Sequence, residues 1–163
     1  MSNLSKKAEK IKLIATDIDG VWTDARMYVT KDGDFMKAFS TYDGMAVSML
    51  KEKGIIVAIL TSENTDIVLA RAKKLKINEV YVDEHEKLKR LYYLSKKYDI
   101  TMDEIAYIGD DINDLEALKA VGISALTANS PIKDLLNPDY TTIRKGGHGA
   151  FREFSDFILN SKK

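Results

Sequence analysis

Cysteine is absent from this sequence of 163 residues, and only two of the residues are proline. The absence of cysteine excludes a disulfide scaffold, thiolate chemistry and zinc or iron–sulfur sites with cysteine ligands. No run approaches the ~18 apolar residues that a membrane-spanning helix needs, and residues 1–12 lack the apolar core of a signal peptide. We therefore expect a cytoplasmic protein that has no membrane partner.

The sequence also lacks net charge, because 25 Lys and Arg residues balance 25 Asp and Glu residues. Proteins that bind the phosphate backbone of nucleic acid usually carry a basic excess, so we expect no nucleic-acid partner. Gly- and Ser-rich linkers, internal repeats and low-complexity segments are missing as well. The length suits one domain, which predicts a single domain over residues 1–163.

Short strand-like apolar runs alternate along the chain with longer segments of helical periodicity. Residues 55–60 are apolar throughout, as in a strand that is buried on both faces. The alternation predicts an α/β fold of three layers, a Rossmann-like parallel sheet flanked by helices. We expect strands at residues 11–16, 55–60, 79–82, 105–108 and 123–126, and helices at 43–53, 65–75, 84–98, 112–121 and 150–159.

A small β-hairpin is expected as an insertion over about residues 25–40. Asp32-Gly33 lies between two strand-like runs, 27–30 and 35–39, and this dipeptide is a strong hairpin signal. The alternation of these runs is consistent with the burial of four apolar side chains, Met27, Val29, Phe35 and Phe39.

Acidic side chains follow the first strand, and in parallel sheets ligands bind at the carboxyl ends of the strands. Asp17 and Asp19 lie on the same side of an extended segment, and Gly20 allows a sharp turn after them. Two carboxylates held together repel each other, so a divalent cation is their natural neutraliser. The alternative is a pair of solvated loop aspartates.

Hydroxyl groups follow the second strand. Thr61 and Ser62 could bind a phosphate oxygen at the start of a helix, although N-capping of that helix is the simpler alternative. Lys87, near the start of the helix over residues 84–98, could supply a point charge for phosphate. Taken singly, Lys87 could equally be a solvated surface lysine.

Three carboxylates within five residues, Asp110, Asp111 and Asp114, follow the strand at residues 105–108. Capping of the next helix would need one or two of them, so the cluster favours metal ligation. These signals occur in order on successive strand ends, and the arrangement is more specific than any one of them.

Phosphoryl transfer is the chemistry that this set of residues can perform. A carboxylate beside Mg²⁺ can attack phosphorus and form an aspartyl-phosphate, and a second carboxylic acid can protonate the leaving alkoxide. Catalysis by histidine is poorly supported, because His85 lies in a polar run and His148 in a glycine-rich loop.

The motifs Asp17-x-Asp19-Gly-Val-x-Thr, Thr61, Lys87 and Gly-Asp110-Asp-x-x-Asp resemble those of the haloacid dehalogenase superfamily of phosphatases. The segment 146–153 extends the likeness to the small sugar-acid phosphatases that act on 3-deoxy-octulosonate 8-phosphate or nonulosonate 9-phosphates. The resemblance covers nearly the whole chain.

The resemblance implies a role for each motif residue. Asp17 would be the nucleophile and Asp19 the general acid and base, while Thr61, Ser62 and Lys87 would hold the phosphoryl group. Mg²⁺ would be bound by the Asp17 carboxylate, the Asp19 backbone carbonyl and Asp110. Asp111 and Asp114 would orient the metal waters or the lysine, although either could approach the ion.

A cap domain covers the site in many members, but here a hairpin and one helix fill the interval between Asp19 and Thr61. We therefore expect no cap domain. The resemblance implies a homotetramer in which the hairpins pack together and a neighbouring subunit covers the active site.

The expected substrate is the phosphate of a 2-keto-3-deoxy sugar acid. Octulosonate phosphatases of this group tend to have Gly-Arg after the hydroxyl residue of the second motif, where this chain has Ser62-Glu63. Glu63 with Lys74, and Arg71 for the substrate carboxylate, is similar to the branch that prefers nine-carbon acids, although Arg71 and Lys74 could be solvated helix cations. We expect deaminoneuraminate (KDN) or N-acylneuraminate 9-phosphate, with 3-deoxy-D-manno-octulosonate 8-phosphate as the alternative.

Two functions of other classes remain as alternatives. Receiver domains of signalling systems combine acidic residues, a threonine and a lysine on a parallel sheet, but in another order along the chain. An inactive regulatory domain, of the kind fused to nucleotide-sugar synthetases, is disfavoured because every motif residue is present.

Overall fold

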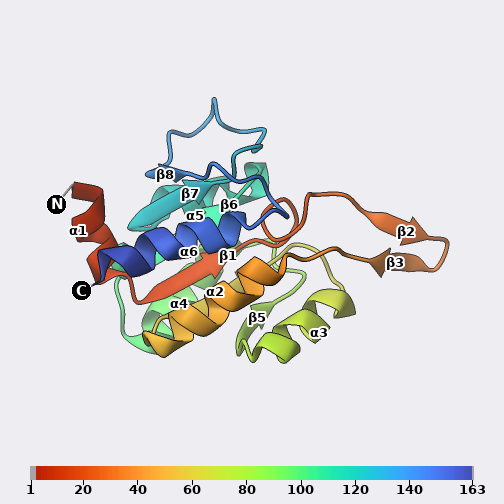
Figure 1. Cartoon of the computed structure of the whole chain (residues 1–163), viewed down its shortest axis with the longest axis horizontal. Coiled ribbons are helices and arrows are strands. Elements are labelled where there is room, and N and C mark those ends of the chain that lie inside the picture. The colour runs from red at the N-terminus through yellow and green to blue at the C-terminus, as the bar shows by residue number, and fades with distance from the viewer. Residues whose placement is uncertain (1–2, 163) are drawn as a thin grey trace.

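A parallel sheet of six strands forms the centre of the computed structural model, which describes residues 3–162 (Figure 1). All of the pairings between neighbouring strands in this sheet are parallel. The strands lie in the order β5 (Glu79–Tyr81), β4 (Ile56–Leu60), β1 (Leu13–Thr16), β6 (Ile105–Gly109), β7 (Ile123–Leu126) and β8 (Tyr140–Thr141).

Helices cover both faces of the sheet, because alternate side chains of each strand point to opposite sides. Ile14 packs in the core beneath α2 (Thr41–Glu52), α3 (Asp66–Leu75) and α6 (Ala150–Ser161). Leu13 and Ala15 pack in the core beneath α4 (Lys87–Tyr98) and α5 (Leu115–Ala120). In Figure 1, α2 and α6 cross one face and α4 and α5 lie behind. Helix α1 spans Asn3–Lys10.

This architecture confirms the predicted fold class: a three-layer, Rossmann-like sheet with a hairpin and no cap domain in the described chain. Two elements were not predicted from the sequence: α1, in which only Ala8 is buried, and β8, which has two residues. Helix α4 begins three residues later than predicted. Glu84 lies before the helix, and its side chain accepts hydrogen bonds from the Arg90 Nε and the Glu86 amide, at 2.6 and 3.0 Å.

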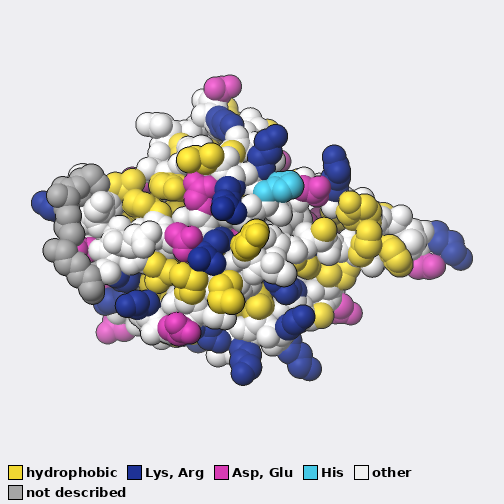
Figure 2. Space-filling model, viewed as in Figure 1, with side chains coloured by type: hydrophobic (Ala, Val, Ile, Leu, Met, Phe, Trp, Pro, Cys, Tyr) yellow, Lys and Arg dark blue, Asp and Glu magenta, His cyan; other side chains and the backbone are white. Residues whose placement is uncertain are grey.

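The predicted hairpin, β2 (Tyr28–Thr30) with β3 (Gly33–Met36), projects away from the body of the molecule (Figure 1). Within one chain it buries little: Val29 is 60% and Phe35 67% exposed. Phe39, beyond the hairpin, is the only one of the four predicted apolar residues that packs against the core. Figure 2 shows the resulting stripe of hydrophobic side chains along the hairpin.

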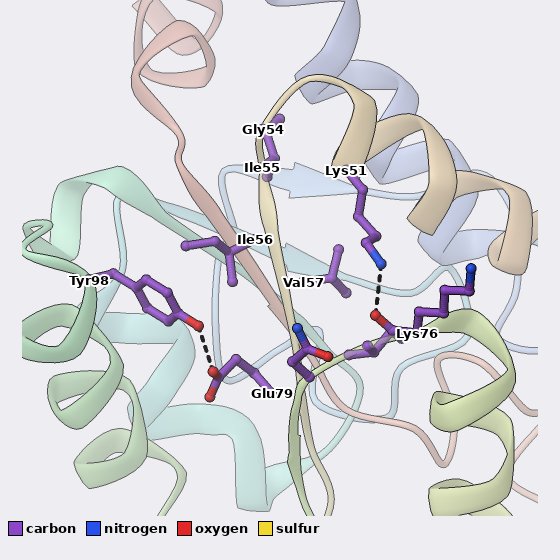
Figure 3. A pocket seen from close by; sticks show the side chains of 10 residues that line it. Lys51, Gly54, Ile55, Ile56, Val57, Lys76, Glu79 and Tyr98 are labelled. Atoms are coloured by element: carbon purple, nitrogen blue, oxygen red, sulfur yellow. Dashed lines mark hydrogen bonds between the residues drawn. The ribbon is translucent and has the colours of Figure 1, made fainter.

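A hollow at the amino ends of β4 and β5 is lined by Glu79, whose carboxylate accepts several hydrogen bonds (Figure 3). Glu79 accepts hydrogen bonds from the hydroxyls of Tyr81 and Tyr98, at 2.5 Å each, and from the Lys97 Nζ at 2.6 Å. Burial opposes its ionisation, but these hydrogen bonds outweigh burial and lower the pKa of Glu79. Because the Glu79 carboxylate already has its donors, we interpret Glu79, Tyr81, Lys97 and Tyr98 as a structural group, here called the Glu79 cluster.

The Glu79 cluster should make stability depend on pH. A carboxyl group whose pKa is lowered by folding stabilises the protein above its ordinary pKa and loses that contribution as the pH falls through its folded pKa. We expect Glu79→Gln to reduce the free energy of unfolding in urea at pH 7 and to reduce it much less near pH 3. Glu116→Gln, at an exposed residue paired with Lys119, should change little at either pH. An equal loss for Glu79→Gln at both pH values would contradict the expectation.

Candidate active site

The carboxyl ends of β1, β4 and β6, three adjacent strands, open into one hollow. Most of the predicted site residues meet there, although they come from segments far apart in the chain. The lining consists of Asp17, Asp19, Ala25, Thr61, Ser62, Glu63, Asp110, Asp111 and Asn113.

Asp17 is buried at the base of this hollow, directly after β1. Its Oδ1 accepts a hydrogen bond from the Ile18 amide at 2.7 Å, and its Oδ2 lies 2.8 Å from the Lys87 Nζ. Burial, reinforced by the negative charge of Asp114, raises the pKa of Asp17 to about 7, although Lys87 acts in the opposite direction. Asp17 is thus held rigidly in a place where its charge requires a positive neighbour.

Hydrogen bonds and ring packing fix the loop after Asp17. The amides of Val21, Trp22 and Thr23 all donate to the Ile18 carbonyl, at 2.8–3.2 Å, which coils the chain into a tight turn. The indole of Trp22 donates to the Thr16 hydroxyl at 3.1 Å and packs against the ring of Phe151. These contacts explain why an apolar tryptophan belongs in a catalytic loop.

Lys87 occupies the first turn of α4 and is almost completely buried. Its ammonium lies between two carboxylates, 2.8 Å from Asp17 and 2.6 Å from Asp114. Burial opposes the charge, but Asp17 and Asp114 prevail and raise the pKa of Lys87. The solvated-lysine alternative is therefore wrong for this residue.

Asp114 is fully buried, and both of its carboxylate oxygens already have donors. Its Oδ1 accepts from Lys87 and from the Tyr107 hydroxyl, at 2.6 Å each, and its Oδ2 accepts from the Asp110 amide at 2.9 Å. Of the two roles left open by the sequence, this geometry favours orientation of the lysine. Tyr107, which sequence reasoning missed, looks like an ordinary core residue of an apolar strand.

Asp110 faces Gly20 across the floor of the site. Gly20 has φ +83°, and a Cβ there would lie 1.8 Å from the Asp110 Oδ2, so no side chain fits between the two loops. The Ser130 hydroxyl holds the Asp110 carbonyl at 2.6 Å. Burial, followed by repulsion from Asp114 and Asp17, raises the pKa of Asp110 to about 8.

The carboxylates of Asp17 and Asp110 could hold a divalent cation, with the carboxylate of Asp114 close by. Their oxygen atoms lie within 4.8 Å of one another. Burial and repulsion between the carboxylates raise the pKa values of Asp17 and Asp110 despite Lys87, so a further cation would stabilise the ionised forms. Carboxylate oxygens are the ligands that Mg²⁺ prefers in proteins, and Asp17 and Asp110 both line the hollow.

Thr61, Ser62 and Glu63 form another wall of the hollow. Helix α3 begins at Asp66, and its N-cap is Thr65, whose hydroxyl accepts from the Ile67 amide at 3.3 Å. The capping alternative for Thr61 and Ser62 is therefore wrong. The Ser62 hydroxyl instead donates to the Glu84 carbonyl and accepts from the Asn113 side chain, at 3.3 and 3.2 Å.

Arg71 and Lys74 do not line the hollow of their own chain. Arg71 points toward α2, where its Nη2 donates to the Ser40 carbonyl at 3.4 Å and its guanidinium lies over the Phe39 ring. Lys74 lies in a groove between α2 and α3. Their role in substrate binding stays a prediction.

The glycine loop at residues 146–149 packs against the loop that follows Asp17. A Cβ on Gly146 would lie 1.9 Å from the Gly20 carbonyl oxygen, and the Gly147 amide donates to the Val21 carbonyl at 3.0 Å. The side chain of His148 is exposed, as is that of His85, and neither residue lines the hollow.

Two contacts to Asp19 were missed by the sequence analysis. The Thr23 hydroxyl lies 3.2 Å and the Lys37 Nζ 2.7 Å from the Asp19 Oδ1. Thr23 could have been found, because it belongs to the same motif as Asp19. Lys37 is one of many lysines and lies beyond the hairpin, so no local signal marks it.

Comparison with known proteins agrees with this geometry. Residues 32–122 match the family model of the haloacid dehalogenase-like hydrolases. The 3-deoxy-D-manno-octulosonate 8-phosphate phosphatase KdsC of Haemophilus influenzae is 36% identical over 98% of this chain and 88% of that protein. The corresponding protein of Escherichia coli K12 is 35% identical over 94% of this chain and 81% of its own length.

Solved structures of similar proteins have the same fold. The phosphatase of this type from Moraxella catarrhalis, in complex with a magnesium ion, a phosphate ion and KDO, is 37% identical with a TM-score of 0.94, over 99% of this chain and 93% of that one. The cobalt-bound Haemophilus influenzae structure is 37% identical with a TM-score of 0.92, over 96% and 91%. This chain therefore belongs to the haloacid dehalogenase-like hydrolases, as a phosphatase that hydrolyses phosphomonoesters.

Proposed function

We propose that this protein, as one domain over residues 1–163, is a Mg²⁺-dependent phosphatase acting on 3-deoxy-D-manno-octulosonate 8-phosphate. The observation that carries the proposal is the buried Asp17, held by Lys87 and sharing one hollow with Asp110, Thr61 and Ser62. The names of the similar proteins support the substrate.

Asp17 acts as the nucleophile. Its carboxylate forms a bond to phosphorus as the bond from phosphorus to the ester oxygen breaks, and the product is an aspartyl-phosphate. Lys87 and the hydroxyls of Thr61 and Ser62 hold the phosphoryl oxygens. Asp17, the Asp19 carbonyl and Asp110 would hold Mg²⁺, which would supply positive charge for the approach of an anion to a phosphate.

Asp19 acts as general acid and then as general base. It gives its proton to the ester oxygen as the sugar acid leaves. It then takes a proton from the water whose oxygen attacks phosphorus and releases phosphate from Asp17. The position of Asp19 on the wall of the same hollow, two residues after Asp17, supports this assignment.

The similar proteins favour the eight-carbon alternative over the nine-carbon substrate that the sequence analysis expected. Glu63 lies in the hollow, where it can contact the sugar, but Arg71 and Lys74 do not. The departure at Ser62-Glu63 is thus a local difference within a site whose overall likeness is to octulosonate phosphatases.

We further propose that the chain assembles as a homotetramer whose neighbouring subunit covers the active site. The exposed apolar side chains of the hairpin, Met27, Tyr28, Val29, Phe35 and Met36, support assembly, because single chains rarely expose so many adjacent apolar groups. Among residues 3–162, no helix is long and apolar enough to span a membrane.

Replacement of the nucleophile tests the reaction. Asp17→Asn should abolish release of phosphate, since an amide is a poor nucleophile. Asp99→Asn is the matched control, because Asp99 is exposed, lies outside the hollow and has φ +51°, a conformation that asparagine tolerates. Activity should be measured with Mg²⁺ as phosphate released, and wild-type turnover by Asp17→Asn would contradict the assignment.

Comparison of the two sugar acids tests the substrate. We expect kcat/KM for 3-deoxy-D-manno-octulosonate 8-phosphate to exceed that for deaminoneuraminate 9-phosphate by about tenfold or more, the size of one pocket contact. Glu63→Ala should change this ratio, whereas Leu69→Ala, at an exposed residue of α3 outside the hollow, should not. A higher kcat/KM for the nine-carbon substrate would overturn the proposal.

The solution mass tests the assembly. We expect a mass near four times 18.3 kDa, and a smaller species when Val29 and Phe35 are both changed to lysine. Ile143→Lys is the matched control, because Ile143 is 90% exposed but lies outside the hairpin. Light scattering that gives the mass of one subunit for the wild type would exclude the tetramer.

A further inference from the structure

Lys37 is a buried lysine at the base of an exposed hairpin. It follows β3 directly, and its side chain is only 2% exposed, whereas Val29 and Phe35 within the hairpin are mostly exposed. An ammonium group is buried only where it is paired, since the unpaired charge would lose its hydration. The partners of Lys37 therefore show what it is placed to do.

The charged partner of Lys37 is Asp19. The Lys37 Nζ lies 2.7 Å from the Asp19 Oδ1, and its other contact among the described residues is the weakly accepting sulfur of Met27, at 3.8 Å. Met27 precedes β2 and Lys37 follows β3, so the two arms of the hairpin meet at this point. The base of the hairpin is thereby tied to the loop after Asp17.

Asp19 is held through one oxygen and free at the other. Its Oδ1 receives both Lys37 and the Thr23 hydroxyl, the latter at 3.2 Å. Its Oδ2 has no hydrogen-bond partner within residues 3–162, although it is buried and the residue lines the hollow. Two donors on Oδ1 fix the carboxyl group, which leaves Oδ2 for a ligand in the hollow.

We infer that Lys37 is a positioning residue for Asp19, which rests on the proposed role of Asp19 as general acid and base. Lys37 holds Oδ1 so that Oδ2 carries the proton to the ester oxygen as the bond to phosphorus breaks. Before that step the protonated Asp19 accepts the hydrogen bond from Lys37 at Oδ1 without being its charge partner. Asp19 becomes a carboxylate in the step, and the ammonium stabilises the charge that develops. Lys37 keeps its own protons throughout.

The dependence on the leaving group tests this inference. The alkoxide of an alkyl phosphate needs a proton, whereas p-nitrophenolate leaves p-nitrophenyl phosphate without one. We expect Lys37→Met to lower kcat/KM for 3-deoxy-D-manno-octulosonate 8-phosphate by about tenfold or more, part of the ordinary effect of a general acid. It should lower kcat/KM for p-nitrophenyl phosphate much less. An equal loss with both substrates, or no loss, would overturn the inference.

Lys31→Met is the matched control, because Lys31 lies in the turn of the same hairpin and its side chain is 91% exposed. It should change neither rate constant. Thermal unfolding and solution mass show whether Lys37→Met keeps its fold and assembly. If it does not, Lys37→Gln, which keeps length and polarity but not charge, should show the same leaving-group dependence, and its absence would overturn the inference.

A double-mutant cycle separates this inference from the proposed function. Asp19→Asn should lower kcat/KM for the alkyl phosphate, and adding Lys37→Met to it should cost little more, since Lys37 acts through Asp19. Wild-type kcat/KM for Asp19→Asn would contradict the proposed function itself. A large loss for Asp19→Asn with fully additive effects would contradict only the role of Lys37.

Discussion

The ion pairing of Lys87 with Asp17 and Asp114 is the interaction on which the site depends. Burial of like charges beside one another is costly, and burial together with mutual repulsion raises the pKa values of Asp17 and Asp110. The ammonium of Lys87 offsets part of it by lying between Asp17 and Asp114 at 2.8 and 2.6 Å. The remaining negative charge would attract a divalent cation.

The parallel sheet makes this concentration of charge possible. Asp17 follows β1, and Asp110 and Asp114 follow β6. Because β1 and β6 are neighbours, the topology brings their loops together. The loops approach closely only because Gly20 and Gly146 have no side chain. A Cβ on Gly20 would overlap Asp110, and a Cβ on Gly146 would overlap the Gly20 carbonyl. The apolar core on both faces of the sheet holds the strand ends in place.

Much of this arrangement could be predicted from the sequence because it depends on order along the chain. Alternating strands and helices imply a parallel sheet, and polar residues after successive strands must then share one edge, which predicted that Asp17, Thr61 and Asp110 meet. What could not be predicted depends on contacts across space. No local pattern shows that Thr65 and not Thr61 caps α3, or that Lys37 differs from the other lysines. The sequence also does not show whether the Arg71 side chain points to the hollow or toward α2. The choice between substrates of different carbon number likewise depends on the contacts of a few side chains, not on the fold.

The central claim is that a carboxylate at position 17 captures phosphorus, and chemical trapping tests it most directly. An acyl-phosphate is reduced by borohydride, which would convert the aspartate that carried it into homoserine. The enzyme should be quenched with acid during turnover with Mg²⁺ and substrate, treated with borohydride and mapped by peptide mass spectrometry. The account predicts homoserine at residue 17, dependent on substrate. Homoserine at another aspartate, or none at all during active turnover, would contradict it.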